Sequence, residues 1–338
     1  MNIQNLKLAL QNEPKFRYKQ AWQAGFKDLI GNWNENTTLP KNLREKLNQT
    51  VPLEIKAEVF GSKHSKAIKA LLELEDGNKI ETVLLQHNDD RNTVCVSSQV
   101  GCALGCKFCA TGKMGFKRNL TASEIISQVL FFTRYLKQNH PNSRISNIVF
   151  MGMGEPFLNY DNVMEAVKII NDPECFNIGA RHISISTSGI VEGINKFAKE
   201  SLQLNLAISL HAPNDQLRAQ LMPIDRKYPL EEVMEAVEKY VENKSRQVMF
   251  EYLMIENIND GEKEARELAE LMRHPLYVVN LIRYNPTGVF KPSPASRMIK
   301  FKNTLLRAGV KTTQRQGFGT DINAACGQLA GKKKQNNE

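Results

Sequence analysis

The sequence predicts an α/β protein, a partial (β/α)6 barrel preceded by a small helical accessory domain. Short apolar, β-prone runs recur along most of the chain, and segments with helical periodicity separate them. Polar residues gather directly after these runs. Apolar strands that alternate with helices are typical of a parallel sheet covered by helices. We expect the polar residues to meet at the barrel mouth, where the carboxyl ends of the strands converge.

Residues 1–75 are expected to form the helical accessory domain. Basic and aromatic residues alternate there, and Phe16, Trp22 and Phe26 have the helical spacing of a buried face. A base-stacking role for these rings is the alternative. Residues 76–92 carry an Asp-Gly-Asn turn signal beside β-prone runs, which predicts a hairpin and linker.

Residues 93–331 are expected to form the barrel core. Its predicted strands are residues 93–97, 147–151, 182–186, 205–210, 248–255 and 278–284. Thr121 and Glu124 form a capping-box pattern at the start of the first predicted core helix. The basic residues 332–338 are expected to be a disordered tail.

Composition limits the class of protein. The 338 residues are 41% hydrophobic, which suffices for a substantial core. No apolar run is long enough for a membrane helix or a secretory signal, and six cysteines without such a signal predict a reducing cytoplasm. A net charge of +9 favours a polyanionic partner such as nucleic acid, although solvated basic faces are the plainer reading of each lysine run.

Cys102, Cys106 and Cys109 have C-x3-C-x2-C spacing. Three thiolates fit three corners of a [4Fe-4S] cluster and leave the fourth iron for a substrate or cofactor. A structural zinc site needs four ligands, and neither a second C-x2-C pair nor a nearby His completes one. The third interpretation of this triad is three cysteines that bind no metal.

Polar residues after the later strands complete the predicted pocket. They are Gly152 to Glu155, Ser186, Ser188, Ser209, His211 and Asn285. Each of them alone is explained equally well by a turn or a helix start. Their shared position at strand ends predicts a single site.

Several motifs together resemble the RlmN/Cfr family of radical S-adenosylmethionine (SAM) RNA methyltransferases, in order from Glu81 to Gly331. The motifs are Cys102-x3-Cys106-x2-Cys109, Gly152-Met-Gly-Glu-Pro156, Ser186-Thr-Ser-Gly189, Ser209-Leu-His-Ala-Pro-Asn214, Asn280-Leu-Ile-Arg-Tyr-Asn285 and Asp321-Ile-Asn-Ala-Ala-Cys-Gly-Gln-Leu329. The cysteine triad marks a wider superfamily of radical enzymes. The Cys-Gly-Gln-Leu motif combined with Cys-Val-Ser-Ser-Gln is specific to this family.

The resemblance implies one [4Fe-4S] cluster on Cys102, Cys106 and Cys109, and two SAM molecules consumed per turnover. The residues that it assigns to the SAM pocket are Gly154, Glu155, Ser186, Ser209, Leu210, His211 and Asn285.

The resemblance also implies a thiol-based mechanism. One SAM methylates Cys326, and a 5′-deoxyadenosyl radical from the second removes hydrogen from that methyl group. The carbon radical then attacks an adenine C–H carbon, which is not nucleophilic enough for polar methylation. Cys95 releases the adduct through a disulfide with Cys326, and Glu81 matches the family's proton acceptor. Apart from the resemblance, both thiols read as plain buried cysteines and Glu81 as a solvated side chain. Cys175 matches no family role and is expected to be structural.

Pro156 and the residues after it resemble the branch of the family that methylates adenine C2. The implied substrates are an adenosine in the peptidyl-transferase region of 23S rRNA and the adenosine beside the tRNA anticodon, each in a loop or flipped out. We further expect the accessory domain, residues 1–75, to bind RNA. The protein is expected to be a monomer that is reduced by a flavodoxin or ferredoxin. The alternatives are adenine C8 methylation, another radical enzyme that does not need Cys326, and an iron-sulfur or zinc RNA-binding protein without catalysis.

Overall fold

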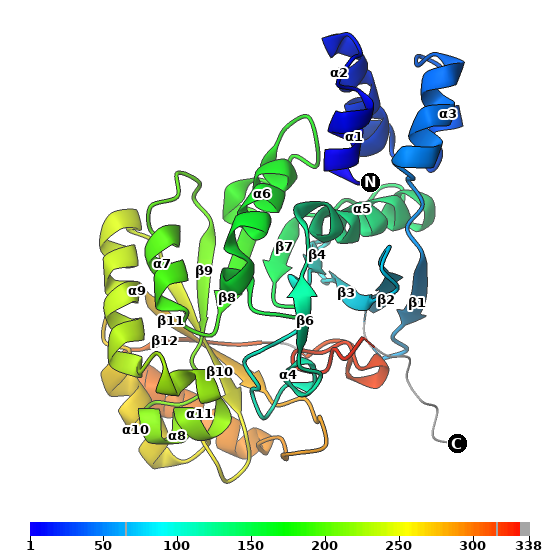
Figure 1. The fold of residues 1–338 in the computed structure, drawn as a ribbon. Helices are drawn as coiled ribbons and strands as arrows, with labels where there is room; N and C mark the ends of the chain where they lie inside the picture. The colour runs from blue at the N-terminus through cyan, green and yellow to red at the C-terminus, as the bar shows by residue number, and fades with distance from the viewer. Residues whose placement is uncertain (65, 316, 332–338) are drawn as a thin grey trace.

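The computed structural model describes residues 1–64, 66–315 and 317–331 of the chain. The basic tail expected at residues 332–338 lies outside these residues. A ten-stranded sheet organises the molecule, in the strand order β1-β2-β3-β4-β7-β8-β9-β10-β11-β12. Figure 1 shows helices on the outer side of this sheet and a separate group of N-terminal helices at one end.

Seven consecutive strands of the sheet are parallel to one another. They are β4 (Asn92–Cys95), β7 (Asn147–Phe150), β8 (Ile183–Thr187), β9 (Asn205–Ser209), β10 (Val248–Met254), β11 (Tyr277–Arg283) and β12 (Lys311–Gln314). The mixed α/β fold with a parallel sheet is thus confirmed. The six predicted strands are all present, and β12 is additional. Its sequence, Lys-Thr-Thr-Gln, is polar because this strand is an exposed edge of the sheet.

Helices follow the parallel strands and cover the outer face of the sheet (Figure 1). They are α5 (Ala122–Asn139), α6 (Tyr160–Asn171), α7 (Val191–Phe197), α8 (Asp215–Leu221), α9 (Leu230–Lys244), α10 (Glu262–Leu271) and α11 (Ala295–Arg307). The predicted capping box begins α5: Thr121 Oγ1 accepts from the Glu124 backbone N–H, and the Glu124 carboxylate accepts from the Thr121 N–H. Among the described helices, none combines the length and the apolar character needed to cross a bilayer.

Three strands extend the sheet before the parallel strands begin. They are β1 (Ala57–Gly61), β2 (Ala67–Glu73) and β3 (Lys79–Gln86). β2 and β3 form the predicted hairpin, and β3 pairs antiparallel with β4. The segment expected to be a linker is therefore an integral part of the sheet, because its β-prone runs find partners on both sides.

The N-terminal helices are α1 (Ile3–Ala9), α2 (Lys15–Gln23) and α3 (Lys41–Thr50). The helical segment is shorter than the expected residues 1–75, since β1 and β2 occupy its last part. Trp33 and Phe26 are buried in its core, whereas Phe16 is 53% exposed, so its expected burial was wrong. Arg134 of α5 fastens this segment to the barrel by donating to the backbone carbonyls of Leu53 and Ile30.

Candidate functional site

The three motif cysteines lie on one loop between β5 (Gln99–Gly101) and the short helix α4 (Ala110–Lys113). β5 pairs with β6 (Phe116–Asn119), and this hairpin fixes both ends of the loop. The hairpin requires a glycine at position 101, where φ is +78° and an added Cβ would lie 1.9 Å from the Gly115 carbonyl oxygen. The Cys102 N–H donates to that same oxygen at 3.0 Å. The backbone thus sets where the first thiol lies.

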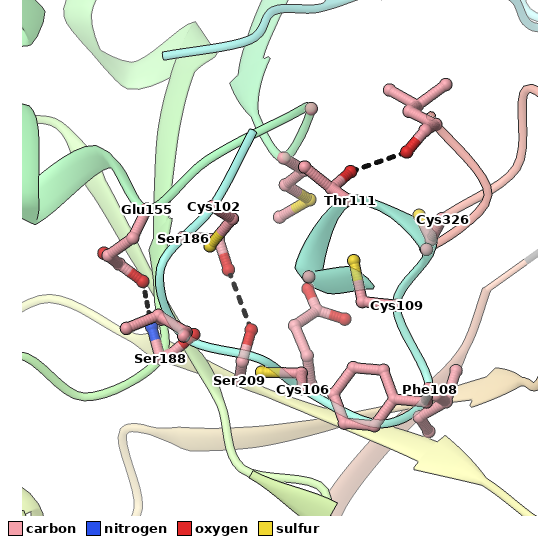
Figure 2. Close-up of a pocket in the computed structure, with 18 of the residues that line it drawn as sticks. Cys102, Cys106, Phe108, Cys109, Thr111, Glu155, Ser186, Ser188, Ser209 and Cys326 are labelled. Carbon is pink, nitrogen blue, oxygen red and sulfur yellow. Dashed lines mark hydrogen bonds between the residues drawn. The ribbon is translucent and has the colours of Figure 1, made fainter. Parts of the chain in front are cut away.

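A cavity of about 150 Å³ lies at the carboxyl ends of the strands. We call it the cluster chamber because Cys102, Cys106 and Cys109 all line it. Figure 2 shows these thiols around the same cavity as Glu155 and the serines. The other predicted residues in its wall are Gly154, Glu155, Ser186, Ser188, Ser209 and His211. Predicted residues that follow four separate strands therefore share one cavity, as their positions after the strands predicted.

The thiols of the cluster chamber are chemically suited to an iron-sulfur cluster. Burial raises the pKa of Cys102 to about 12 and that of Cys106 further, so neither ionises readily without a bound cation. No described group of three His, Cys, Asp or Glu side chains is arranged to hold one metal ion. A cluster instead takes one thiolate at each of several irons. Three thiols spread around one cavity fit a cluster better than a single zinc ion.

Glu155 places a buried carboxylate in the wall of the cluster chamber. Its Oε2 accepts from the Ser188 N–H at 2.7 Å (Figure 2), and its Oε1 accepts from the Phe157 N–H at 3.0 Å. Burial raises the pKa of this carboxyl group, and these backbone donors oppose the rise. At the preceding Gly154, φ is +100° and a Cβ would lie 2.8 Å from the Gln99 nitrogen. The close packing at Gly154 therefore fixes the position of the Glu155 carboxylate, which is an acceptor suited to an ammonium group.

Two serines and a histidine complete the far side of the cluster chamber. Ser186 Oγ lies 3.4 Å from Ser209 Oγ. His211 Nδ1 accepts from the Leu253 N–H at 3.1 Å, and burial lowers the pKa of this imidazole to about 3, so the ring is neutral. Leu210 is buried behind the wall and does not line the cavity.

A second cavity of about 430 Å³ adjoins the cluster chamber. We call it the Cys95 chamber, because Cys95 lines it together with Asn285, Tyr284 and Phe318. The two cavities have five residues in common: Met151, Ile282, Arg315, Cys326 and Leu329. Cys326 thus lies in a wall that both chambers share.

Cys95 and Cys326 are brought together as expected, although they are far apart in the sequence. Burial raises the pKa of Cys95 to about 12, and the nearby Cys326 thiol adds to the rise. All six cysteines are free thiols. The expected disulfide between Cys95 and Cys326 is therefore not supported by the structure. Cys175 is buried and accepts from Trp22 Nε1 at 2.9 Å.

Cys326 lies on a segment that we call the C-terminal strap, residues 323–331. The Ala110 N–H donates to the Gly327 carbonyl at 2.7 Å, and Thr111 Oγ1 donates to the Leu329 carbonyl at 2.6 Å. Asn285 Nδ2 donates to the Cys326 carbonyl at 3.1 Å. Asn285, expected in the SAM pocket, instead lines the Cys95 chamber and holds the strap.

Glu81, the expected proton acceptor, lines neither chamber. Its side chain is only 1% exposed and pairs with Lys69 Nζ at 2.8 Å. Its Oε2 accepts from the Ala330 N–H at 2.7 Å and from the Gly331 N–H at 3.3 Å. In this structure Glu81 anchors the end of the strap to strand β3.

Two residues of the chamber walls were missed in the sequence. Glu251 lies in the cluster chamber on β10, where a lone carboxylate in an apolar strand was the available signal. Arg315 lines both chambers directly after β12. The sequence did not indicate that Arg315 belongs to the site, because the polar strand β12 before it was not recognised as a strand.

Comparison with known proteins agrees with this geometry. The profile of the radical SAM superfamily matches residues 96–269. The chain is 46% identical to a probable dual-specificity RNA methyltransferase RlmN from Dictyoglomus thermophilum, covering 94% of this chain and 91% of the relative. It is 45% identical to one from Streptococcus gordonii, covering 94% and 90%. A radical SAM methyltransferase from Sphaerobacter thermophilus superposes with a TM-score of 0.93 at 43% identity, covering 97% and 96% of the two chains.

Proposed function

Because the chain belongs to the RlmN family of radical SAM RNA methyltransferases, we propose that it methylates adenine C2 in 23S rRNA and in tRNA, with Cys326 as methyl carrier. The protein is an RNA methyltransferase that uses an iron-sulfur cluster and SAM. The position of Cys326 in the wall shared by both chambers is the observation that carries the proposal. A methyl carrier has to meet its methyl donor and then its acceptor.

In the cluster chamber, Cys102, Cys106 and Cys109 would hold one [4Fe-4S] cluster. Glu155 would bind the SAM ammonium group, and Ser186 and Ser209 would bind polar atoms of the same molecule. When bound, the cluster and two successive SAM molecules supply a methyl group and a carbon-centred radical. His211 shapes the wall as a neutral ring, and Leu210 packs behind it.

The Cys95 chamber is the proposed site for the target adenine. An adenine that reaches it has to leave its stack, so we expect a flipped-out or loop nucleotide. Joining the base to Cys326 through the methyl carbon leaves one unpaired electron on the adduct, and that electron would pass to the bound cluster when the ring proton is lost. Cys95 then attacks the Cys326 sulfur. A sulfur–sulfur bond forms, and the sulfur–carbon bond breaks with its electron pair on the carbon. That carbon then takes up a proton.

Cys95 and Glu81 are the two proposed acceptors for the proton that the adenine ring loses. Cys95 lines the chamber, whereas the Glu81 carboxylate is held by Lys69 and the strap. The contacts favour Cys95. Glu81 would reach the ring only after the strap released it.

One experiment tests reaction, position and substrate together. The reconstituted protein is incubated with SAM, a reductant and either a 23S rRNA fragment or tRNA, and the nucleosides are analysed by mass spectrometry. We expect 2-methyladenosine from both RNAs and none with Cys326→Ala. Formation of 8-methyladenosine would contradict the C2 assignment, and unchanged product with Cys326→Ala would contradict the carrier role.

The oligomeric state, the cellular location and the electron donor of the enzyme are also proposed. The protein is proposed to act as a monomer. We assign the protein to the cytoplasm, with a flavodoxin or ferredoxin as electron donor. Size-exclusion chromatography with light scattering tests the first point, and reconstitution with each purified donor tests the last.

A further inference from the structure

Arg315 occupies a distinctive position beside the proposed methyl carrier. It directly follows β12, and its backbone N–H donates to the Leu281 carbonyl at 2.9 Å, which keeps it in register with β11. It is therefore at the carboxyl end of the sheet. Its side chain lines the cluster chamber and the Cys95 chamber, as Cys326 does.

Among the residues that the structure describes, the Arg315 guanidinium has a weak side-chain partner. Its Nη1 lies 3.4 Å from the Met151 sulfur, and no ion pair joins it to a carboxylate within the part of the chain that the structure describes. Glu251 is nearby, but its Oε2 already accepts from Asn280 Nδ2 at 2.8 Å. A guanidinium beside a cavity wall favours an anion at short range.

The nearby groups that can become anionic are two thiols and one carboxyl group. Charge interaction with the Cys326 side chain is the largest cause of the raised pKa of Arg315; burial opposes the rise, and Glu251 and Cys95 add smaller contributions. Arginine stays charged across the physiological pH range. It therefore stabilises a thiolate without competing for the proton that the thiol gives up.

We propose that Arg315 is a positioning residue that stabilises the negative charge on the Cys326 sulfur as this thiol gives up its proton and is methylated. This inference rests on the proposed role of Cys326 as methyl carrier. The thiolate lone pair forms a bond to the SAM methyl carbon while the carbon–sulfonium bond breaks, and S-adenosylhomocysteine leaves. The negative thiolate and the positive sulfonium are both neutralised, so the step needs no further reactant.

The same reasoning gives Arg315 a second partner later in the reaction. A methylated Cys326 is a neutral thioether and no longer attracts the guanidinium. Cys95, in the adjoining chamber, is then the remaining thiol beside it. Arg315 thus serves the two thiols in succession.

The test uses the cluster-loaded protein with unmethylated Cys326 and SAM, without a reductant. Neutral Arg315→Gln is compared with charge-retaining Arg315→Lys, and Arg315→Met replaces the Gln variant if that variant does not fold. Arg307→Gln is the matched control, because this exposed arginine at the end of α11 lines neither chamber. Three quantities are measured: the rate of Cys326 methylation by peptide mass spectrometry, SAM affinity, and the rate of Cys326 alkylation by iodoacetamide.

We expect the neutral variant to slow both methylation and alkylation of Cys326 by about tenfold or more, since the thiolate is the nucleophile in each. SAM affinity should be unchanged, and Arg315→Lys should recover much of both rates. Unchanged rates in the neutral variant would overturn the inference, as would equal losses in the Gln and Lys variants. A wild-type protein that forms no S-methylcysteine would instead overturn the proposed function, while the alkylation rates would still test Arg315.

Discussion

Burial shifts the pKa values of ionisable groups in the wall of the cluster chamber. The pKa of Cys102 is raised to about 12, and the pKa of His211 is lowered to about 3. Desolvation is the main cause in both, and it disfavours the charged form of each group. His211 is therefore a neutral residue of the chamber wall. The cysteines form thiolates readily only when a bound cation stabilises the negative charge. Their environments assign these side chains different roles.

Cys106 tests the assignment of the cluster. Cys106→Ala removes one of three protein ligands, so we expect bound iron and sulfide to fall at least about tenfold. Anaerobic reconstitution followed by iron and sulfide analysis measures this. Cys95→Ala is the control, because Cys95 lines only the adjoining chamber, and its iron content should match the wild type. Equal iron in the Cys106→Ala protein would place the cluster elsewhere.

Cys95 tests the release step. Without this thiol, an adenine joined to Cys326 has no neighbouring nucleophile to free it, so Cys95→Ala should accumulate covalent protein–RNA adduct. Denaturing gel electrophoresis after a single turnover detects the adduct as an RNA-dependent shift. The double variant Cys95→Ala/Cys326→Ala should give none. A Cys95→Ala protein that releases methylated RNA at the wild-type rate would assign the step to another group.

The turn that follows β7 depends on the conformation of Gly154. A Cβ there would meet Gln99 atoms at 2.5 to 2.8 Å, and φ is +100°. We expect Gly154→Ala to lower the free energy of unfolding by about 2–4 kcal/mol and to weaken SAM binding. Denaturant unfolding and equilibrium SAM binding measure the two effects. Gly61→Ala on β1 is the control, since nothing lies within 4 Å of its added Cβ. Equal effects would rule out a specific steric cause.

The strap is an element held from two sides. Glu81 fixes the end of the strap to β3, and Thr111 fixes the strap to α4, which directly follows Cys109. Glu81→Gln would leave the 3% exposed Lys69 side chain without its carboxylate, which costs about 3–5 kcal/mol. Thr111→Val removes one hydrogen bond, which should lower the free energy of unfolding by about 1 kcal/mol.

Denaturant unfolding, with hydrogen exchange of the strap peptide, separates these roles of Glu81 and Thr111. Both variants should speed exchange in residues 323–331, and only Glu81→Gln should lose several kcal/mol. The double variant Lys69→Met/Glu81→Leu should recover stability yet keep the fast exchange. Unchanged strap exchange in Glu81→Gln would show that Glu81 does not anchor the strap.

The sequence predicted the elements with strong local patterns. Six parallel strands were visible as apolar runs, and Thr121 with Glu124 marked the start of α5. The polar edge strand β12 was not visible, and Arg315 after it was missed for that reason. The positions of Glu81 and Asn285 depend on how the strap packs. No local pattern encodes such long-range hydrogen bonds.

The strand order of the whole sheet brings distant segments of the chain together. Cys95 ends β4, Glu155 follows β7 and the strap follows β12, yet all three contribute to the two adjoining chambers. The strap then returns to β3, near the opposite end of the sheet. The open sheet is thus bridged across its mouth by the segment that carries Cys326. This arrangement explains how one sulfur reaches two cavities.

The N-terminal helices extend the molecule beyond the barrel (Figure 1). On α2, Phe16 is 53% exposed, Arg17 lies 4.8 Å from its ring centre, and Lys15 and Lys19 are exposed. Exposed cations beside a free ring suit phosphate contacts and base stacking.

The double variant Lys15→Glu/Lys19→Glu tests whether α2 contacts RNA. If α2 does, two phosphate contacts are lost, so binding to the rRNA fragment should weaken and the slope of log affinity against log salt should become shallower by about 1.4–1.8. Fluorescence anisotropy at several salt concentrations measures both quantities. Lys300→Glu/Arg307→Glu on α11 makes the same charge change away from α2 and should keep the wild-type slope (Figure 1). Equal losses in both double variants would mean that only net charge matters, because counterion release at specific phosphates depends on where the cations lie.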